Sequence, residues 1–373
     1  MKKVLLVASV QSHICQFHRP LVELLHSKGF EVHVAAHYNL DVKPGLKLDF
    51  VDKVIEIPFS RSITSSENVA AYKAIKKLID TTYYDVIHCN TPIASVLTRL
   101  AAQKTRKKGT KIIYTAHGFQ FYKGSSKKDW LLYYPIEKVM SHYTDLIFTI
   151  NKEDYEVAQQ FHCDNVVYIP GVGVDTNRFK VAQPINLRNE LSLPEDAFIV
   201  LSVGELFPRK NHKVIIDAMP SLKQYPIYYV ICGNGILESE LKEQCVKNEV
   251  VDRVFFLGYR RDIPQVMKAC NVFAFPSTRE GLGLAGIEAM AAGLPVVSSN
   301  INGILDYMIE NKTGHMCSPN DPDAFAKAIL DFYQSSEKIA EIAEFNAEHA
   351  KMFDTKASID AIEKGYRSIV DFN

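Results

Sequence analysis

The sequence predicts an α/β protein with two domains, each built on a parallel sheet. Short apolar runs alternate with helical patterns along most of the 373 residues, as in parallel strands joined by crossover helices. A chain of this length is too long for one compact core. The alternation breaks only between Pro170 and Pro194, where prolines and glycines gather. We therefore expect one domain over 1–175, a second over 176–354, and a final helix over 355–373 that packs back on the first.

Each strand is expected where a short apolar run precedes a turn or a helical pattern. In the first domain the strand candidates are 4–9, 31–36, 53–58, 85–90, 111–118, 145–150 and 165–170, and the helix candidates are 20–28, 70–80 and 94–107. In the second domain the strand candidates are 198–204, 227–233, 254–258, 272–277 and 295–299. Ligands of such sheets bind at the carboxyl ends of the strands, so functional residues are expected in the loops that follow them.

The amino-acid composition excludes several classes of protein. Lys plus Arg and Asp plus Glu each number 43, so no charge bias favours nucleic acid. Seven cysteines without a CxxC pair argue against a disulfide framework or a zinc site and favour a reducing cytoplasmic location. No apolar stretch reaches the roughly 18 residues of a membrane span. The N-terminal run Val4–Ala8 is too short for a signal peptide and fits a core strand.

The most informative segment begins at Glu280 and reads EGLGLAGIEAMAAGLPVV. It follows the apolar run 272–277, so the chain is expected to leave a strand, pass through a glycine loop and enter a helix. The amides of residues 283–285 would then lack helical partners and offer a seat for a phosphate. Two carboxylates beside such a seat, Glu280 and Glu288, are expected to face the hydroxyl groups of a sugar and a ribose.

From Ser277 to Val297 the chain resembles the retaining glycosyltransferases of family 4, whose signature is E-G-x-G-x-x-x-x-E-A-M-A-x-G-x-P-V-V. The phrases HGFQFYKG, WLLYYPIEK and TINKEDY are similar to bacterial exopolysaccharide and capsule glycosyltransferases. The resemblance implies the GT-B fold, with an acceptor-side domain and a nucleotide-sugar donor domain, both Rossmann-like, facing across a cleft. It implies transfer of a hexose or N-acetylhexosamine from a nucleotide diphosphate sugar, expected to be UDP-linked. The acceptor is expected to be a glycan or an undecaprenyl-diphosphate-linked saccharide.

The resemblance also assigns donor-site roles in the second domain. Glu280 would face the donor sugar and Glu288 the ribose. In SVGELFPRKNH, Lys210 corresponds to the diphosphate-binding lysine of the family, whereas the usual arginine after the glycine is replaced by Glu205. Arg209 is a neighbouring cation that can supply this charge, although a solvated loop residue is an equally simple interpretation. The donor-binding residues expected are Gly204, Arg209, Lys210, Gly233, Asn234, Tyr259, Arg260, Glu280, Gly283, Leu284, Ala285 and Glu288.

Three histidines are the candidates in the first domain. His117 follows a strand end in YTAHGFQFYKG, where the family places a histidine–glycine pair that faces the transferred sugar. With Glu280 and Lys210 it completes the expected catalytic set, although a histidine there often only bonds its own loop. His13 and His18 are expected on the acceptor side, in a loop SVQSHICQFHRP that lacks the glycines common in the family.

No cofactor or metal is expected. The one D-x-D, Asp321–Asp323, is interpreted as a helix N-cap with Pro322 at the first helical position. The diphosphate would instead be held by amides and Lys210. In NGILDYMIE only Gly303 remains of the family's Gly-Gly-x-x-Glu, and it is expected only to shape the site.

The lysine-rich segments 104–111 and 123–134 raise the prospect of peripheral contact with an anionic membrane, with Trp130 at the interface. A solvated surface is the alternative. Two other functions stay open at this point: a sugar-nucleotide epimerase on the same fold, and a relative that binds a nucleotide sugar without catalysis. The sequence determines neither the sugar, the acceptor, the linkage nor the oligomeric state.

Overall fold

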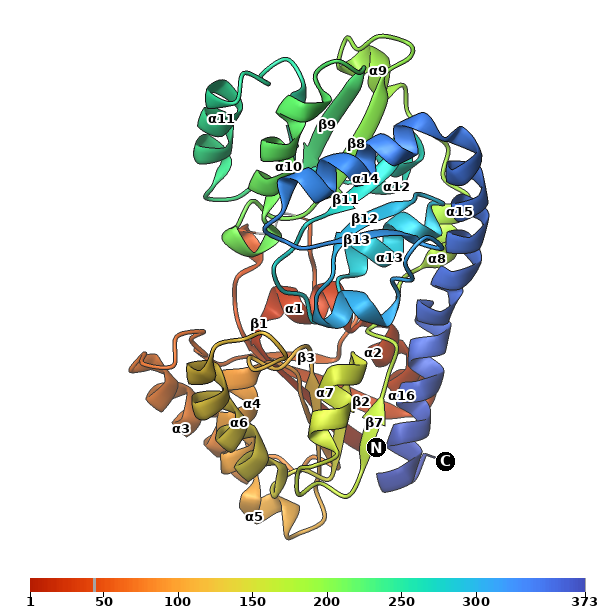
Figure 1. The fold of residues 1–373 in the computed structure, drawn as a ribbon. Coiled ribbons are helices and arrows are strands. Elements are labelled where there is room, and N and C mark those ends of the chain that lie inside the picture. Colours follow the sequence, from red (N-terminus) through yellow and green to blue (C-terminus); the bar gives the residue numbers. More distant parts are fainter. Residues whose placement is uncertain (43–44, 373) are drawn as a thin grey trace. The chain divides into compact units, whose positions relative to one another are not determined.

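The chain forms two compact units, seen in a computed structural model that describes residues 1–42 and 45–372. One unit contains Met1–Gly173 together with Thr355–Asn373, and the other contains Val174–Asp354. Each holds one parallel sheet with helices packed against it (Figure 1). The predicted α/β class with two parallel sheets is confirmed, as is the return of the C-terminal helix to the first unit.

The first sheet has seven strands in the order β3-β2-β1-β4-β5-β6-β7, all parallel. Its strands are β1 (Lys2–Val10), β2 (Phe30–His37), β3 (Lys53–Glu56), β4 (Val86–Cys89), β5 (Lys111–Ala116), β6 (Leu146–Thr149) and β7 (Val166–Tyr168). The helices of this unit are α1 (Gln11–Phe17), α2 (Arg19–Ser27), η1 (Leu40–Val42), α3 (Glu67–Thr81), α4 (Pro92–Ala101), α5 (Gln103–Arg106), α6 (Lys127–Ser141), α7 (Lys152–Ala158) and α16 (Thr355–Ile369). The strand order reverses between β1 and β4.

The segment after the first strand is a helix, so the loop expected there is wrong. Helix α1 starts at Gln11, directly after β1 ends. Gln11, Ser12 and Ile14 are buried, so this short helix is held by tertiary packing rather than by strong helix formers.

The C-terminal helix α16 completes the first unit. Tyr366 is fully buried, and its hydroxyl lies 2.7 Å from Nδ1 of His88 on β4. A Cβ at Gly365 would lie 2.5 Å from the Phe148 ring, so only glycine allows this close approach of the helix to β6. The last residues of the chain are therefore part of the core of the first unit.

The second sheet has six parallel strands in the order β10-β9-β8-β11-β12-β13. Its strands are β8 (Phe198–Val203), β9 (Ile227–Cys232), β10 (Val254–Gly258), β11 (Val272–Phe275), β12 (Val296–Ser299) and β13 (Gly314–Cys317). Its helices are α8 (Thr176–Lys180), α9 (Leu187–Glu190), η2 (Pro208–Lys210), α10 (His212–Ala218), η3 (Met219–Leu222), α11 (Glu238–Lys247), α12 (Ile263–Lys268), α13 (Leu284–Ala291), η4 (Asn302–Asp306), α14 (Pro322–Gln334), α15 (Ser336–His349) and η5 (Ala350–Phe353). The order reverses between β8 and β11.

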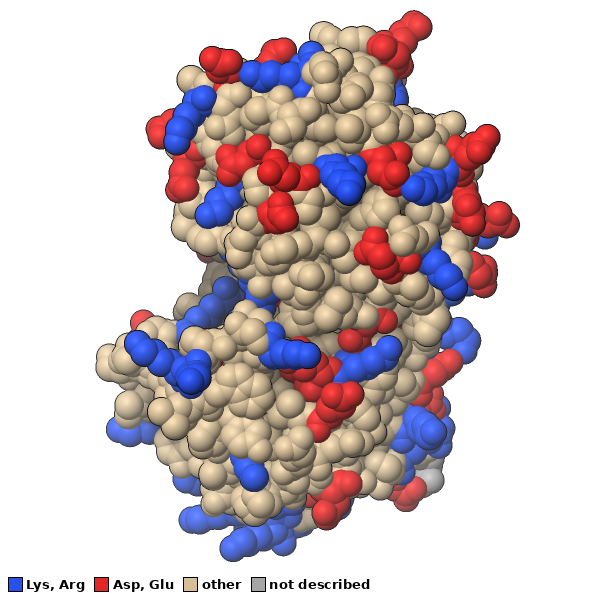
Figure 2. All heavy atoms as spheres, in the orientation of Figure 1, with Lys and Arg blue, Asp and Glu red and all other residues tan. Residues whose placement is uncertain are grey.

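Acidic and basic side chains are interspersed over much of the surface face in Figure 2, in line with their equal numbers in the sequence. Within the described ranges, none of the helices is both long enough and apolar enough to cross a bilayer.

Candidate functional site

Lys210 and Glu280, two of the expected donor-site residues, meet at the point where the order of the second sheet reverses. β8 and β11 are neighbours there, and the chain leaves them toward opposite sides. In open parallel sheets this switch point is where ligands bind. Lys210 lies in the connection that follows β8, and Glu280 lies in the connection that follows β11.

Glu280 is the centre of this arrangement. Its Oε1 accepts hydrogen bonds from Lys210 Nζ at 2.7 Å and from Ser277 Oγ at 2.8 Å. Its Oε2 accepts one from Arg209 Nη1 at 2.8 Å. The carboxylate is almost completely buried, so these three donors satisfy a charge that would otherwise be costly to place there.

The charged groups around Glu280 carry a net positive charge, which favours the binding of an anion. Burial acts to raise the pKa of Glu280, but Lys210 and Arg209 outweigh it and hold the pKa below its usual value. Glu280 is therefore ionised at neutral pH. Two cations around one carboxylate leave one net positive charge, and the Arg209 side chain is also exposed to an incoming ligand.

Glycine permits the close packing around Lys210. A Cβ at Gly204 would lie 3.3 Å from both Cδ and Cε of Lys210, while the Nζ lies 5.3 Å from the centroid of the Phe275 ring. Gly233 has φ +154°, and a Cβ there would lie 1.9 Å from the carbonyl oxygen of Gly204. A side chain at Gly233 would therefore collide with the backbone of Gly204, and one at Gly204 would press on the Lys210 side chain.

Helix α13 starts at Leu284, where the sequence predicts it. Its N-cap, Gly283, has φ +87°, and a Cβ there would lie 2.7 Å from the Phe275 ring. Left-handed backbone and the close ring both require glycine. The Gly286 amide bonds the Gly283 carbonyl at 3.0 Å, whereas the amides of Leu284 and Ala285 lie at the open end of the helix and can serve as anion-binding donors close in sequence to Glu280.

Glu288 lies in the middle of α13 and has a different environment from Glu280. It is half-buried, and burial raises its pKa to about 7, with smaller opposing contributions from Arg178 and Lys210. Two carboxyl groups of one motif thus differ in protonation at neutral pH, which suits them to different ligand groups.

The remaining donor-site residues lie at the ends of β9 and β10. The amide of Gly233 donates to the carbonyl of Gly258 at 2.8 Å, which keeps these two strand ends together. Arg260 forms ion pairs with Asp262 at 2.7 Å and with Glu190. The guanidinium of Arg260 is therefore held by ion pairs within the protein, and the backbone around Tyr259 offers the groups that a ligand can contact. Asn234, between Gly233 and the glycine that follows it, accepts through its carbonyl a bond from the Leu206 amide at 3.0 Å.

Three further residues hold the site together and were not assigned roles from the sequence. Asn211 has φ 55° and donates from Nδ2 to the Pro276 carbonyl at 3.0 Å, joining the two loops. Asn302 accepts the Glu280 amide at 3.2 Å. Tyr307, fully buried, donates to the Gly283 carbonyl at 3.3 Å. An asparagine before a helix is a usual signal for left-handed backbone, whereas Tyr307 carries no local signal.

The first unit brings His13, His18 and His117 together. His13 lies in α1, His18 follows α1, and His117 follows β5. The His13 ring centroid lies 5.2 Å from that of His18 and 4.7 Å from that of His117. The Nε2 atoms of all three are buried without a hydrogen-bond partner.

Three buried nitrogens at one place can form hydrogen bonds to a bound molecule or to water. Burial lowers the pKa of each of the three histidines, to about 4 for His117, so the rings are neutral at physiological pH. Neutral imidazoles can bond the hydroxyl groups of a sugar. One nitrogen from each lies within 4.8 Å of the others, so the three could also hold a transition-metal ion. Asp321, by contrast, accepts the Ala324 amide at 3.0 Å, which confirms it as a helix cap.

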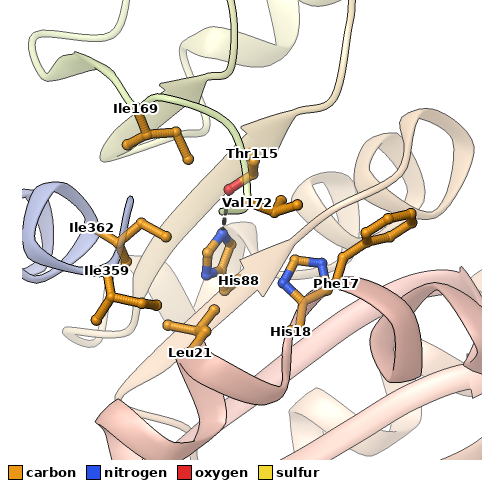
Figure 3. A pocket seen from close by; sticks show the side chains of 9 residues that line it. All are labelled: Phe17, His18, Leu21, His88, Thr115, Ile169, Val172, Ile359 and Ile362. Carbon is orange, nitrogen blue, oxygen red and sulfur yellow. Dashed lines mark hydrogen bonds between the residues drawn. The ribbon is translucent and has the colours of Figure 1, made fainter. Parts of the chain in front are cut away.

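A small cavity borders this cluster (Figure 3). His88 lies among its lining residues, bonded through Nε2 to the Thr115 hydroxyl at 2.7 Å. His18 lines the cavity from the first connection, and Ile359 and Ile362 line it from α16. The C-terminal helix thus supports the elements that carry the histidines.

Comparisons with known proteins identify the family of the chain. The family model described as glycosyl transferases group 1 matches residues 185–349, and the one described as glycosyl transferase 4-like matches residues 3–151. The protein named "Putative glycosyltransferase EpsD" of Bacillus subtilis strain 168 is 36% identical over 379 residues, covering 100% of this chain and 98% of EpsD. The chain is a group 1 glycosyltransferase of family 4. This family retains the anomeric configuration and uses nucleotide sugars, so the predicted class of enzyme is confirmed.

Two other relatives of this glycosyltransferase carry informative names. An Escherichia coli UDP-Gal:alpha-D-GlcNAc-diphosphoundecaprenol alpha-1,3-galactosyltransferase is 29% identical over 326 residues, covering 83% of this chain and 81% of that enzyme. The crystal structure of Anabaena HepE in complex with UDP and glucose has a TM-score of 0.79 at 22% identity, covering 99% of this chain and 100% of HepE. The likeness to HepE shows the GT-B fold.

Proposed function

We propose that this glycosyltransferase transfers a hexose or N-acetylhexosamine from a UDP-sugar to a glycan or an undecaprenyl-diphosphate-linked saccharide, in the synthesis of a bacterial surface polysaccharide. The observation that carries the proposal is the buried carboxylate of Glu280 between Lys210 and Arg209 at the switch point. UDP is favoured because HepE was crystallised with UDP and the E. coli relative is named for UDP-Gal. The same name includes a diphosphoundecaprenol acceptor.

The donor diphosphate is proposed to take over the surplus positive charge. Lys210 donates to the phosphates while it stays bonded to Glu280, and the amides of residues 283–285 donate to the phosphate oxygens. Arg209 supplies the cation that Glu205 does not, because its guanidinium already reaches Glu280 from the same loop. The remaining lone pairs of the Glu280 carboxylate accept hydroxyl groups of the sugar.

Glu288 is proposed to accept the ribose hydroxyls. Binding them favours the ionised carboxylate, which its raised pKa makes available only above about pH 7. The backbone at Asn234, Tyr259 and Arg260 forms the wall beside the nucleobase.

The chemical step follows from these positions. The bond between the anomeric carbon and the β-phosphate oxygen breaks, and UDP leaves with the electron pair. The acceptor hydroxyl attacks from the same face, and its proton goes to the departing phosphate oxygen. Lys210 and the amides of α13 stabilise the charge that develops on the diphosphate. His117, neutral at physiological pH, bonds the transferred sugar, while His13 and His18 face the acceptor.

We place the reaction in the cytoplasm, where nucleotide sugars are made and where free thiols persist. The described cysteines are all free. Diphosphate binding by Lys210 and backbone amides requires no metal ion or other cofactor.

A panel of nucleotide diphosphate sugars tests the proposal, read by saturation-transfer NMR and by the shift in melting temperature. One UDP-sugar is expected to bind selectively to the wild type. Lys210→Met is expected to weaken it about tenfold to a hundredfold, because a charged hydrogen bond is worth about 1.5–3 kcal/mol. Lys213→Met, an exposed lysine at the start of α10, is the matched control and should leave binding unchanged.

Turnover is then measured with the donor so identified and with saccharide-diphosphate-lipid acceptors. If no nucleotide sugar binds, or if Lys210→Met and Lys213→Met behave alike, the donor site is wrong. A donor that binds but is never transferred to these acceptors would refute the acceptor assignment alone.

A further inference from the structure

Helix α6 of the first unit presents an apolar stripe to solvent. Leu131 is 81% exposed, Leu132 50% and Val139 53%, and Ile136 and Pro135 are also exposed. Positions 131, 132, 135, 136 and 139 recur at helical spacing and so occupy one face. Soluble monomers rarely leave a contiguous apolar face of this kind uncovered.

The opposite face of α6 anchors the helix. Trp130 packs against Phe121 with ring centroids 5.1 Å apart, and its indole nitrogen donates to the Tyr122 carbonyl at 3.2 Å. Glu137 is buried and pairs with the buried Arg99 at 2.9 Å. Trp130 therefore packs within the unit rather than forming the interface expected from the sequence, and the exposed leucines take that position. Because the opposite face of α6 packs against the unit, the apolar stripe cannot be buried in the core of that unit.

Basic side chains border the stripe. Lys127 and Lys128 are exposed at its N-terminal end, and Lys138 lies on its flank. The acid beside them, Asp129, is held by the Ser126 hydroxyl and amide in a capping box. The Asp129 carboxylate offsets one of the three lysines, so the border of the stripe keeps a net positive charge.

A second basic group lies at the other end of α6. Arg106 on α5 donates to the carbonyl of His142, the residue after α6, at 3.0 Å. This contact places the exposed lysines at 104, 107 and 108 near the C-terminal end of the stripe. Figure 2 shows the surface over α6 mostly free of charged side chains, with blue side chains below it over α5.

We propose that this face of α6 docks the protein on an anionic membrane surface, with Leu131 and Leu132 entering the boundary between headgroups and acyl chains. A helix lying in the interface pairs an apolar face with basic residues that meet the lipid phosphates. A second copy of the chain would oppose lysines to lysines at both ends of the stripe, so charge complementarity favours the lipid. The proposal depends on the surface of the first unit alone and not on the donor site.

Vesicle flotation with the full-length protein tests the proposal. Vesicles of phosphatidylcholine with phosphatidylglycerol are compared with phosphatidylcholine alone, at low and at physiological salt. The wild type is expected to float with the anionic vesicles and to be released as salt rises. Leu131→Glu with Leu132→Glu should lower the partition coefficient at least about tenfold. Lys127→Gln with Lys128→Gln should lower it about twenty-five-fold, since each lysine contributes about fivefold near an anionic surface.

The matched control is Val246→Glu with Val251→Glu, two similarly exposed valines of the second unit, which should leave flotation unchanged. All these positions are exposed, so the variants should fold, as near-UV circular dichroism will show. No flotation at low salt, or flotation that survives the leucine changes, overturns the proposal. A dimer in light scattering that the leucine changes dissolve, without vesicle binding, overturns it in favour of a second copy. Donor-induced melting shifts are read in parallel, so a protein that floats but binds no UDP-sugar refutes only the proposed function.

Discussion

Replacing Glu280 with glutamine separates affinity for the nucleotide from turnover. Without a donor, the carboxylate holds Lys210 and Arg209 at 2.7 and 2.8 Å. A bound diphosphate must share the Lys210 ammonium group with the Glu280 carboxylate. The substitution keeps the size of the side chain and its ability to accept a bond from Ser277, but it removes the competing negative charge. UDP should therefore bind more tightly to the Glu280→Gln variant, while sugar transfer becomes slower.

The contact distances set the magnitude. A phosphate oxygen and a carboxylate oxygen that both bond the Lys210 nitrogen lie about 5 Å apart. Two unit charges at that distance repel by about 3 kcal/mol at an effective dielectric constant of about 20. Allowing for partial screening, removal of the charge should strengthen UDP binding at least about tenfold. The turnover number should fall about a hundredfold, as when one oriented polar contact to a transition state is lost.

Isothermal titration with UDP and steady-state kinetics with the UDP-sugar measure the two effects on one preparation. Glu238→Gln provides the same change of charge at a partly exposed residue that forms an ion pair with Lys242, and it should alter neither quantity. Equal or weaker UDP binding by Glu280→Gln would show that the carboxylate does not lie beside the diphosphate. The charge argument for the site would then be refuted.

Three further outcomes are expected. Burial raises the pKa of Glu288 to about 7, so its carboxylate becomes protonated as the pH falls through that value. The affinity for UDP should therefore decrease when the pH is lowered from about 8 to about 6. Titrations of the Glu288→Gln variant should show a flatter pH profile. Gly283→Ala should lower the free energy of unfolding by about 2–3 kcal/mol and abolish UDP binding, because φ is +87° and the Phe275 ring lies 2.7 Å from the added carbon. Gly124→Ala, at φ +100° with open space around it, should cost only about 1 kcal/mol in the same urea titration. His117→Ala should reduce the turnover number about tenfold to a hundredfold with UDP affinity unchanged, and an equal loss of UDP affinity would contradict its placement at the sugar.

The strands could be predicted because parallel strands buried on both faces are continuous apolar runs, which few other segments imitate. Helix α1 and strand β13 were missed for the opposite reason. Helix α1 begins with Gln11 and Ser12, polar residues that suggested a loop but are buried. Strand β13 reads GHMC and has no apolar run; it forms because Gly314 can approach Val296, where a Cβ would lie 1.9 Å from the carbonyl oxygen.

The residues of the site could be predicted from the sequence, but the hydrogen bonds between them could not. The signature of the family indicated Glu280 and Lys210, but not that they bond each other across 70 positions of sequence. Nor could the sequence show that Asn211 ties the two loops, or that Tyr307 supports the Gly283 turn. Such contacts depend on which strand ends become neighbours, and only the strand order decides that.

The chain leaves the first unit at Gly173 and returns to it at Thr355, which has a consequence for synthesis on the ribosome. The second unit is contiguous, so it can fold as soon as residue 354 has emerged. The first unit must wait for α16, whose Tyr366 pairs with His88 inside the core. The unit that is synthesised first is thus completed last. A nascent chain stopped before α16 would contain a folded second unit and a first sheet that lacks this helix.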